Sequence, residues 1–179
     1  MIRFSPLMPA EIESFLVANK LVDRATARLR ARASGGSMSR ALSGDIKTFT
    51  AQRRAMLTVL ETLVAASDRT QLLRSAEQLN EAQYKDEFEE RLEVLETLIR
   101  DAWMLAVGVT EELLINEDMA KELQQISQRI EPAKAAAWIL EIEDMREQLI
   151  VNINRKAATD SLFLTMASGV IPQRRVSIK

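Results

Sequence analysis

Residues 84–102 read YKDEFEERLEVLETLIRDA, and this stretch decides the fold class. Its apolar residues recur at steps of 4, 4, 3, 4 and 3: Tyr84, Phe88, Leu92, Leu95, Ile99 and Ala102. That spacing places one apolar stripe along a single face of a long helix. Most of the other positions carry charge, which is typical of a helix with one buried and one solvated face.

Two shorter stripes of the same kind follow further along the chain, each with steps of 4, 3 and 4: Met119, Leu123, Ile126 and Ile130, then Trp138, Ile142, Met145 and Leu149. Asn116 is expected to cap the first of these helices, and Pro132 to open the second. We expect a break at residues 151–154, where β-branched and Asn residues crowd together. The sequence therefore predicts an all-α chain.

Composition agrees with this fold class and excludes much chemistry. Only 4% of the residues are aromatic, and five Gly and four Pro are too few for the many turns of a β protein. The chain has no Cys and no His, which excludes disulfides, thiolate sites, Ser-His-Asp triads and histidine metal sites. We therefore predict no catalytic residue, no metal site and no cofactor.

Net charge and hydropathy limit the kinds of partner that the chain can bind. The net charge of −2 gives the chain no broad attraction for nucleic acid or for a membrane surface. No apolar run approaches the ~20 residues that span a bilayer, and Glu11 and Glu13 interrupt the N-terminal apolar stretch. We expect a cytoplasmic protein without a membrane partner.

Two regions and a tail are expected from the helix signals. Residues 1–43 predict three short helices, opened by Pro9, capped by Asp23 and capped by Ser37, with a stop at Ser34-Gly35-Gly36. Residues 44–168 predict an antiparallel bundle of about five longer helices. Residues 169–179 lose the periodicity and are expected to form a flexible tail.

Three stretches resemble the clamp-loader family, and among its members the delta-prime subunit of bacterial DNA polymerase III. They are RFSPL at 3–7, SGGSMSRAL at 34–42, and MREQL at 145–149 together with NINR at 152–155 and LFL at 162–164. The first resembles the junction from an ATPase core into its helical lid. The second resembles the third lid helix, and the last resembles the final helix pair of the collar domain.

The resemblance implies an AAA+ lid over residues 1–43 and a collar over 44–168, with the ATPase core and its phosphate loop absent. It implies a non-catalytic scaffold within the DNA-directed DNA polymerase III holoenzyme, a nucleotidyltransferase complex active in DNA replication. The partners would be the gamma/tau and delta subunits, through the collar. The sliding clamp and primed DNA would be met only through the whole complex, which loads the clamp.

Candidate site residues follow from these expectations. Arg40 stands at a sensor-like, nucleotide-facing position, which we expect to be vestigial. Arg24, Arg28 and Arg32 share one helix face and form a possible phosphate or partner surface. The acidic run from Asp86 to Glu96 is expected to be a solvated face rather than a metal site. The candidate subunit interface comprises Trp103, Met104, Val107, Trp138, Leu162 and Phe163. The first three lie within residues 102–115, which are apolar nearly all round.

Two other functions stay open at this point. The chain could be the collar of the gamma/tau ATPase subunit, or a free-standing helical adaptor or regulator unrelated to replication. The turn at 152–155 and the short tail favour delta-prime over tau. An enzyme is the least favoured class, since carboxylates and Lys alone would have to supply the chemistry.

Overall fold

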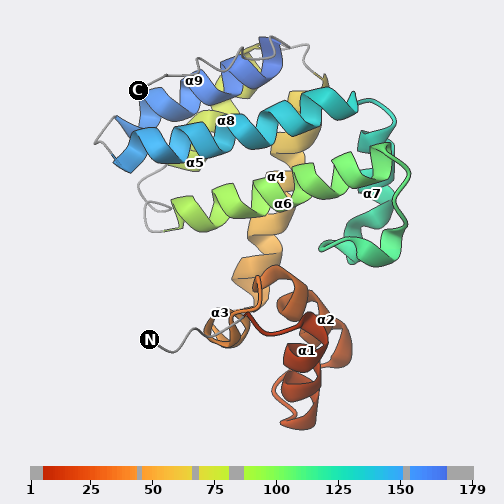
Figure 1. Cartoon of the computed structure of the whole chain (residues 1–179). Helices are drawn as coiled ribbons and strands as arrows, with labels where there is room; N and C mark the ends of the chain where they lie inside the picture. Colours follow the sequence, from red (N-terminus) through yellow and green to blue (C-terminus); the bar gives the residue numbers. More distant parts are fainter. Residues whose placement is uncertain (1–5, 44–45, 66–68, 81–86, 151–153, 169–179) are drawn as a thin grey trace, which may run out of the picture.

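The structure is a computed structural model that describes residues 6–43, 46–65, 69–80, 87–150 and 154–168. Within these ranges every element is helical, as predicted, and no strand occurs (Figure 1). The elements are α1 (Pro9–Ala18), α2 (Arg24–Ala33), α3 (Met38–Leu42), α4 (Ile46–Ala65), α5 (Arg69–Asn80), α6 (Phe88–Ala106), η2 (Glu111–Leu113), η3 (Glu117–Met119), α7 (Ala120–Ser127), α8 (Pro132–Ile150) and α9 (Arg155–Ser168).

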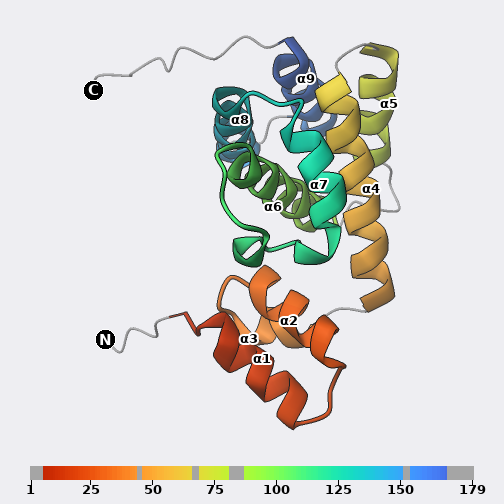
Figure 2. The same ribbon diagram turned by 90° about the vertical axis from the view of Figure 1, so that its right-hand side faces the viewer.

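Helices α1 to α3 form a small unit, which we call the N-terminal module (Figure 2). Local caps set its helix ends, as the sequence predicts. The Asp23 carboxylate accepts a hydrogen bond of 3.0 Å from the backbone N–H of Thr26, and the Ser37 hydroxyl accepts one of 3.4 Å from the backbone N–H of Arg40. The module has its own core of Ile12, Leu16, Ala27, Ala31 and Ala41.

The Gly35-Gly36 turn holds the module together. Both residues have positive φ, at 58° and 83°. A Cβ at Gly36 would lie 2.5 Å from the Cβ of Pro6 and 2.9 Å from the carbonyl oxygen of Leu7, so only Gly fits there. The backbone N–H of Leu7 donates to the carbonyl oxygen of Gly36 at 3.0 Å, which joins the start of the described chain to the turn.

Helices α4 to α9 form the bundle, with α6 between α4, α7 and α8 (Figures 1 and 2). Ion pairs between helix ends show the relative direction of two pairs of helices. Arg146 near the end of α8 pairs with Glu89 near the start of α6, and Lys156 at the start of α9 pairs with Glu77 near the end of α5. These helix pairs are therefore antiparallel, as predicted, whereas α4 crosses α6 at a steep angle in Figure 1.

The predicted stripe on α6 is buried in the bundle core. Phe88 is 4% exposed, and Leu92, Leu95, Ile99 and Ala102 are fully buried; Tyr84 lies outside the described residues. Helix α8 ends at Ile150 and α9 begins at Arg155, on either side of the break expected at residues 151–154. Residues 151–153 of that break lie outside the described residues. The Trp138 indole N–H donates to the carbonyl oxygen of Met166 at 2.8 Å, which ties these two helices side by side.

The expected tail, residues 169–179, lies outside the described residues. The side chain of Asn116 makes no capping hydrogen bond. The short helix η3 follows Asn116 and leads into α7. Among the described helices none combines the length and the apolar character needed to cross a membrane.

Candidate functional site

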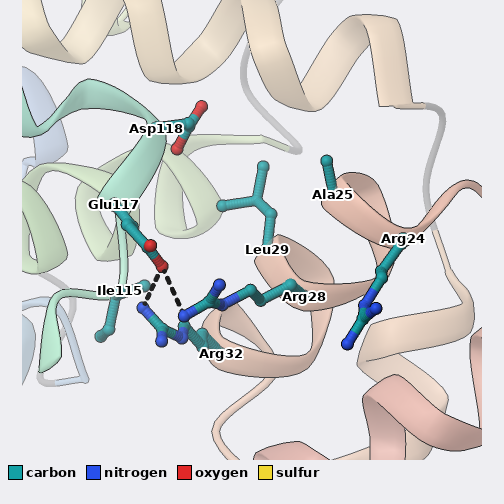
Figure 3. Close-up of a pocket in the computed structure, with 8 residues that line it drawn as sticks. All are labelled: Arg24, Ala25, Arg28, Leu29, Arg32, Ile115, Glu117 and Asp118. Carbon is teal, nitrogen blue, oxygen red and sulfur yellow. Dashed lines mark ion pairs between the residues drawn. The ribbon is translucent and has the colours of Figure 1, made fainter. Parts of the chain in front are cut away.

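A cleft separates α2 from residues 107–119, which we call the connecting segment because it joins α6 to α7. Its volume is about 530 Å³. The lining combines charged side chains with an apolar floor: Arg24, Ala25, Arg28, Leu29, Arg32, Ile115, Glu117 and Asp118. Helix α2 supplies the basic side and the connecting segment supplies the acidic side (Figure 3).

Two of the three predicted arginines converge on one carboxylate. Glu117 Oε2 lies 3.0 Å from Nη2 of Arg28 and 2.9 Å from Nη1 of Arg32 (Figure 3). Arg32 also donates from Nη2 to the carbonyl oxygen of Glu112 at 2.7 Å. The three arginines share a helix, but Arg24 lies apart from Glu117 and is 87% exposed, 3.7 Å from Glu13 within the module.

This arrangement bears on the two roles expected for that face. A phosphate approaching Arg28 or Arg32 would have to displace Glu117, whose negative charge already satisfies both guanidinium groups. In this structure the arginine face of α2 contacts the connecting segment of the same chain. Arg24 is the most exposed member of the predicted set.

A buried polar network fixes the connecting segment, and no pattern in the sequence predicts it. Arg53 on α4 is only 1% exposed. Its Nε donates to Asn116 Oδ1 at 3.0 Å, and its Nη1 and Nη2 donate to the two carboxylate oxygens of Asp118 at 2.9 and 2.6 Å. Such a bidentate pair is directional as well as strong.

Asp101 on α6 holds the same segment from the other side. This fully buried carboxylate accepts backbone N–H bonds from Ile115 at 3.1 Å and from Asn116 at 2.7 Å, and a third from Asn116 Nδ2 at 2.9 Å. Arg100 pairs with it at 3.0 Å. Each buried polar group of the network therefore has partners, as burial requires. Glu117 is presented to α2 from a firmly held backbone.

Arg40, the sensor-like candidate, forms an ion pair with Glu93 of α6, and its side chain is half exposed. The hydrogen bond to Glu93 raises the pKa of Arg40, against the opposing effect of partial burial. It borders a smaller cleft of about 190 Å³ between the module and the bundle, together with Glu90 and Glu93. Acidic neighbours make this a poor place for nucleotide phosphates.

The predicted interface residues fall into two groups. Trp138, Leu162 and Phe163 are 2%, 3% and 0% exposed, so they are core residues of this chain and are not available to a neighbour. The reason is that α8 and α9 pack their apolar faces against each other and against α5 and α6. Trp103 and Met104 are partly buried, and Val107 is 55% exposed.

Residues 102–115 are thus not fully hidden within one chain. Leu113 in η2 is 63% exposed, although the sequence analysis did not single it out. Further large apolar side chains of the bundle reach solvent: Leu73, Leu140, Ile150 and Leu164. The bundle therefore retains apolar surface that its own helices do not cover.

The acidic run on α6 is more than a solvated face. Glu93 pairs with Arg40, and Glu89 and Glu96 both pair with Arg146 of α8, at 2.6 and 2.5 Å. The described residues contain no cluster of three or more acidic, His or Cys residues that could hold a metal ion.

The described residues form a helical bundle that leaves several large apolar side chains exposed. A family model described as DNA polymerase III, delta subunit, C terminal, matches residues 47–165. The chain therefore belongs to this clamp-loader family of DNA polymerase III. The match begins in α4 and ends in α9, so it spans the bundle and leaves out the N-terminal module. A comparison with curated proteins finds no match.

Proposed function

We propose that the chain is the C-terminal part of a delta-prime-like clamp-loader subunit, with residues 1–43 as the lid and 44–168 as the collar. It acts in the cytoplasm as a non-catalytic scaffold. Its collar assembles with the gamma/tau and delta subunits so that the whole complex can load the sliding clamp onto primed DNA.

The observation that carries this proposal is the family match over the bundle, residues 47–165. Exposed apolar side chains on that same bundle support assembly, since Val107 and Leu113 leave more than half of their surface in water. Exposed apolar surface of this kind is typical of protein contact sites. The delta-prime assignment rests on the resemblance at residues 34–42 and 145–164, while the family description names the delta subunit.

Co-purification tests the assembly. A tagged chain is mixed with the gamma/tau and delta subunits of its own organism and isolated. We expect both subunits to be retained at about 1 µM, and we expect Val107→Asp/Leu113→Asp to lower their retention at least about tenfold, since a charge in a contact costs more than ~1.4 kcal/mol.

The control places one negative charge on another helix. Leu164→Asp on α9 alters a side chain that is 39% exposed, and it should leave retention within about twofold if the contact lies at the connecting segment. Loss of retention in both variants alike would move the contact elsewhere on the bundle. No retention of either subunit by the unmodified chain would favour the free-standing adaptor.

A further inference from the structure

The N-terminal module and the bundle do not share a hydrophobic core. The module core consists of residues from α1, α2 and α3, and the bundle core consists of residues from 56 to 166. Among the described residues none belongs to both. A shared core is what makes two helical units move as one, so some other interaction must set the position of the module.

Arginine side chains provide the polar contacts, at two separate places. From α2, Arg28 and Arg32 pair with Glu117 at 3.0 and 2.9 Å. From α3, Arg40 pairs with Glu93 on α6. We call Arg28, Arg32 and Arg40 the arginine clamp. All three basic partners lie on the module and both acidic partners lie on the bundle.

Both contacts stand beside open space. The cleft of about 530 Å³ adjoins Arg28 and Arg32, and the cleft of about 190 Å³ adjoins Arg40. The side chains of Arg28 and Arg40 are about half exposed, so water reaches their ion pairs and salt can screen them. Arg32 is 19% exposed and also donates to the carbonyl oxygens of Glu112 and Leu114, so its contact is less open to screening.

The distribution of charge along the chain adds a longer-range attraction. Residues 1–43 contain seven basic and three acidic residues, a net charge of +4, and residues 44–168 contain fourteen basic and twenty-three acidic residues, a net charge of −9. Two bodies of opposite sign attract each other, and that attraction falls as ionic strength rises.

We propose that the module is docked by the arginine clamp as a salt-sensitive conformational device, which releases and re-docks while both helical cores stay folded. The acceptor Glu117 lies on the connecting segment, which also bears Leu113 and Val107. The module therefore docks on the same segment that presents these exposed apolar side chains. This inference does not depend on which clamp-loader subunit the chain represents.

A distance measurement within the whole chain tests the proposal. The chain contains no Cys, so Ser14→Cys on α1 and Gln125→Cys on α7 give two unique, exposed labelling positions. Pulsed electron paramagnetic resonance between spin labels at these positions reports the distance between module and bundle. We expect one narrow distance in ~0.02 M salt and a broad, longer distribution in ~1 M salt, where the Debye length falls to about 3 Å.

A charge reversal distinguishes the effect of the arginine clamp from the general screening of charges by salt. Glu117→Lys places a cation opposite Arg28 and Arg32 and should broaden the distance even at low salt. Glu111→Lys is the matched control, since it makes the same change at an exposed residue of the connecting segment and should leave the distance narrow. Adding Arg28→Glu to Glu117→Lys restores an ion pair at this place and keeps the hydrogen bonds of Arg32 to the carbonyl oxygens of Glu112 and Leu114, so it should narrow the distribution again.

Helix content by circular dichroism accompanies each sample and should stay unchanged, because neither core is altered. A narrow distance that persists in high salt and in Glu117→Lys would overturn the proposal. Equal broadening by Glu111→Lys and Glu117→Lys would overturn it as well, because the effect would then come from net charge alone.

Discussion

The guanidinium of Arg53 donates to the side-chain oxygen of Asn116 at 3.0 Å in the interior of the bundle, although the two residues are 63 positions apart in the sequence. The same arginine holds Asp118 through two further hydrogen bonds. This contact fixes the connecting segment, and the segment in turn presents Glu117 to α2 and Leu113 to solvent. The positions of Glu117 and Leu113 thus depend on the polar network that Arg53 forms together with Asp101.

Arg53→Met should lower the free energy of unfolding by about 1–3 kcal/mol, because the buried side-chain oxygen of Asn116 loses its donor and Asp118 loses two hydrogen bonds. Urea unfolding followed by circular dichroism measures this. Arg54→Met is the matched control, since the neighbouring Arg54 is 60% exposed and pairs with Glu122 at the surface. A loss beyond ~1 kcal/mol in the control would mean that Arg53 has no special role.

Asp101→Asn should release the connecting segment locally. The amide can accept fewer hydrogen bonds than the carboxylate that now receives three N–H bonds from Ile115 and Asn116. We expect a loss of about 2 kcal/mol and faster hydrogen exchange at the amides of residues 115 and 116. Unchanged exchange at these two amides would contradict the assigned network.

Trp138→Phe should destabilise the chain by about 1–2 kcal/mol, since it removes the hydrogen bond to the carbonyl oxygen of Met166 and part of the core packing. Thermal unfolding measures the effect. Trp103→Phe, at a partly buried position, serves as the control and should cost less. If Trp103→Phe costs more, the tie between α8 and α9 is less important than we infer.

Glu141→Gln should raise the melting temperature at neutral pH. Partial burial, and then the nearby charge of Asp144, raise the pKa of Glu141 above its ordinary 4.5. A raised pKa means that the folded state favours the protonated form, so the stability contributed by Glu141 is present below the unfolded pKa and is lost as pH rises through the folded value. The gain from Gln should therefore vanish at about pH 3.5, below the ordinary pKa.

Melting curves at the two pH values check this prediction. Glu143→Gln removes the same charge from the same helix and controls for the change in net charge. A gain that is equal for both variants, or that persists at the lower pH, would contradict the assigned cause.

Local signals in the sequence predicted much of the fold. Asp23 and Ser37 cap their helices through bonds to residues three positions on, and Pro132 opens α8, because these preferences depend only on neighbouring residues. The stripe on α6 predicted its buried face for the same reason.

The contacts between distant residues could not be predicted in this way. The sequence places Arg28 and Arg32 on one face, but it does not show that Glu117 of the connecting segment contacts them. It suggests a cap at Asn116, whereas the fold turns that side chain toward Arg53 and Asp101. An apolar stripe does not reveal which neighbour covers it. The sequence therefore predicts a subunit interface at Trp138, Leu162 and Phe163, whereas the fold buries these residues within the chain.

The central claim is that this chain takes the place of a delta-prime subunit in a clamp loader. Native mass spectrometry of the chain mixed with the gamma/tau and delta subunits and with full-length delta-prime tests it most directly. We predict one complex in which the chain replaces delta-prime while gamma/tau and delta remain. Replacement of gamma/tau would contradict the delta-prime assignment, and a chain that stays free of every complex would contradict the claim as a whole.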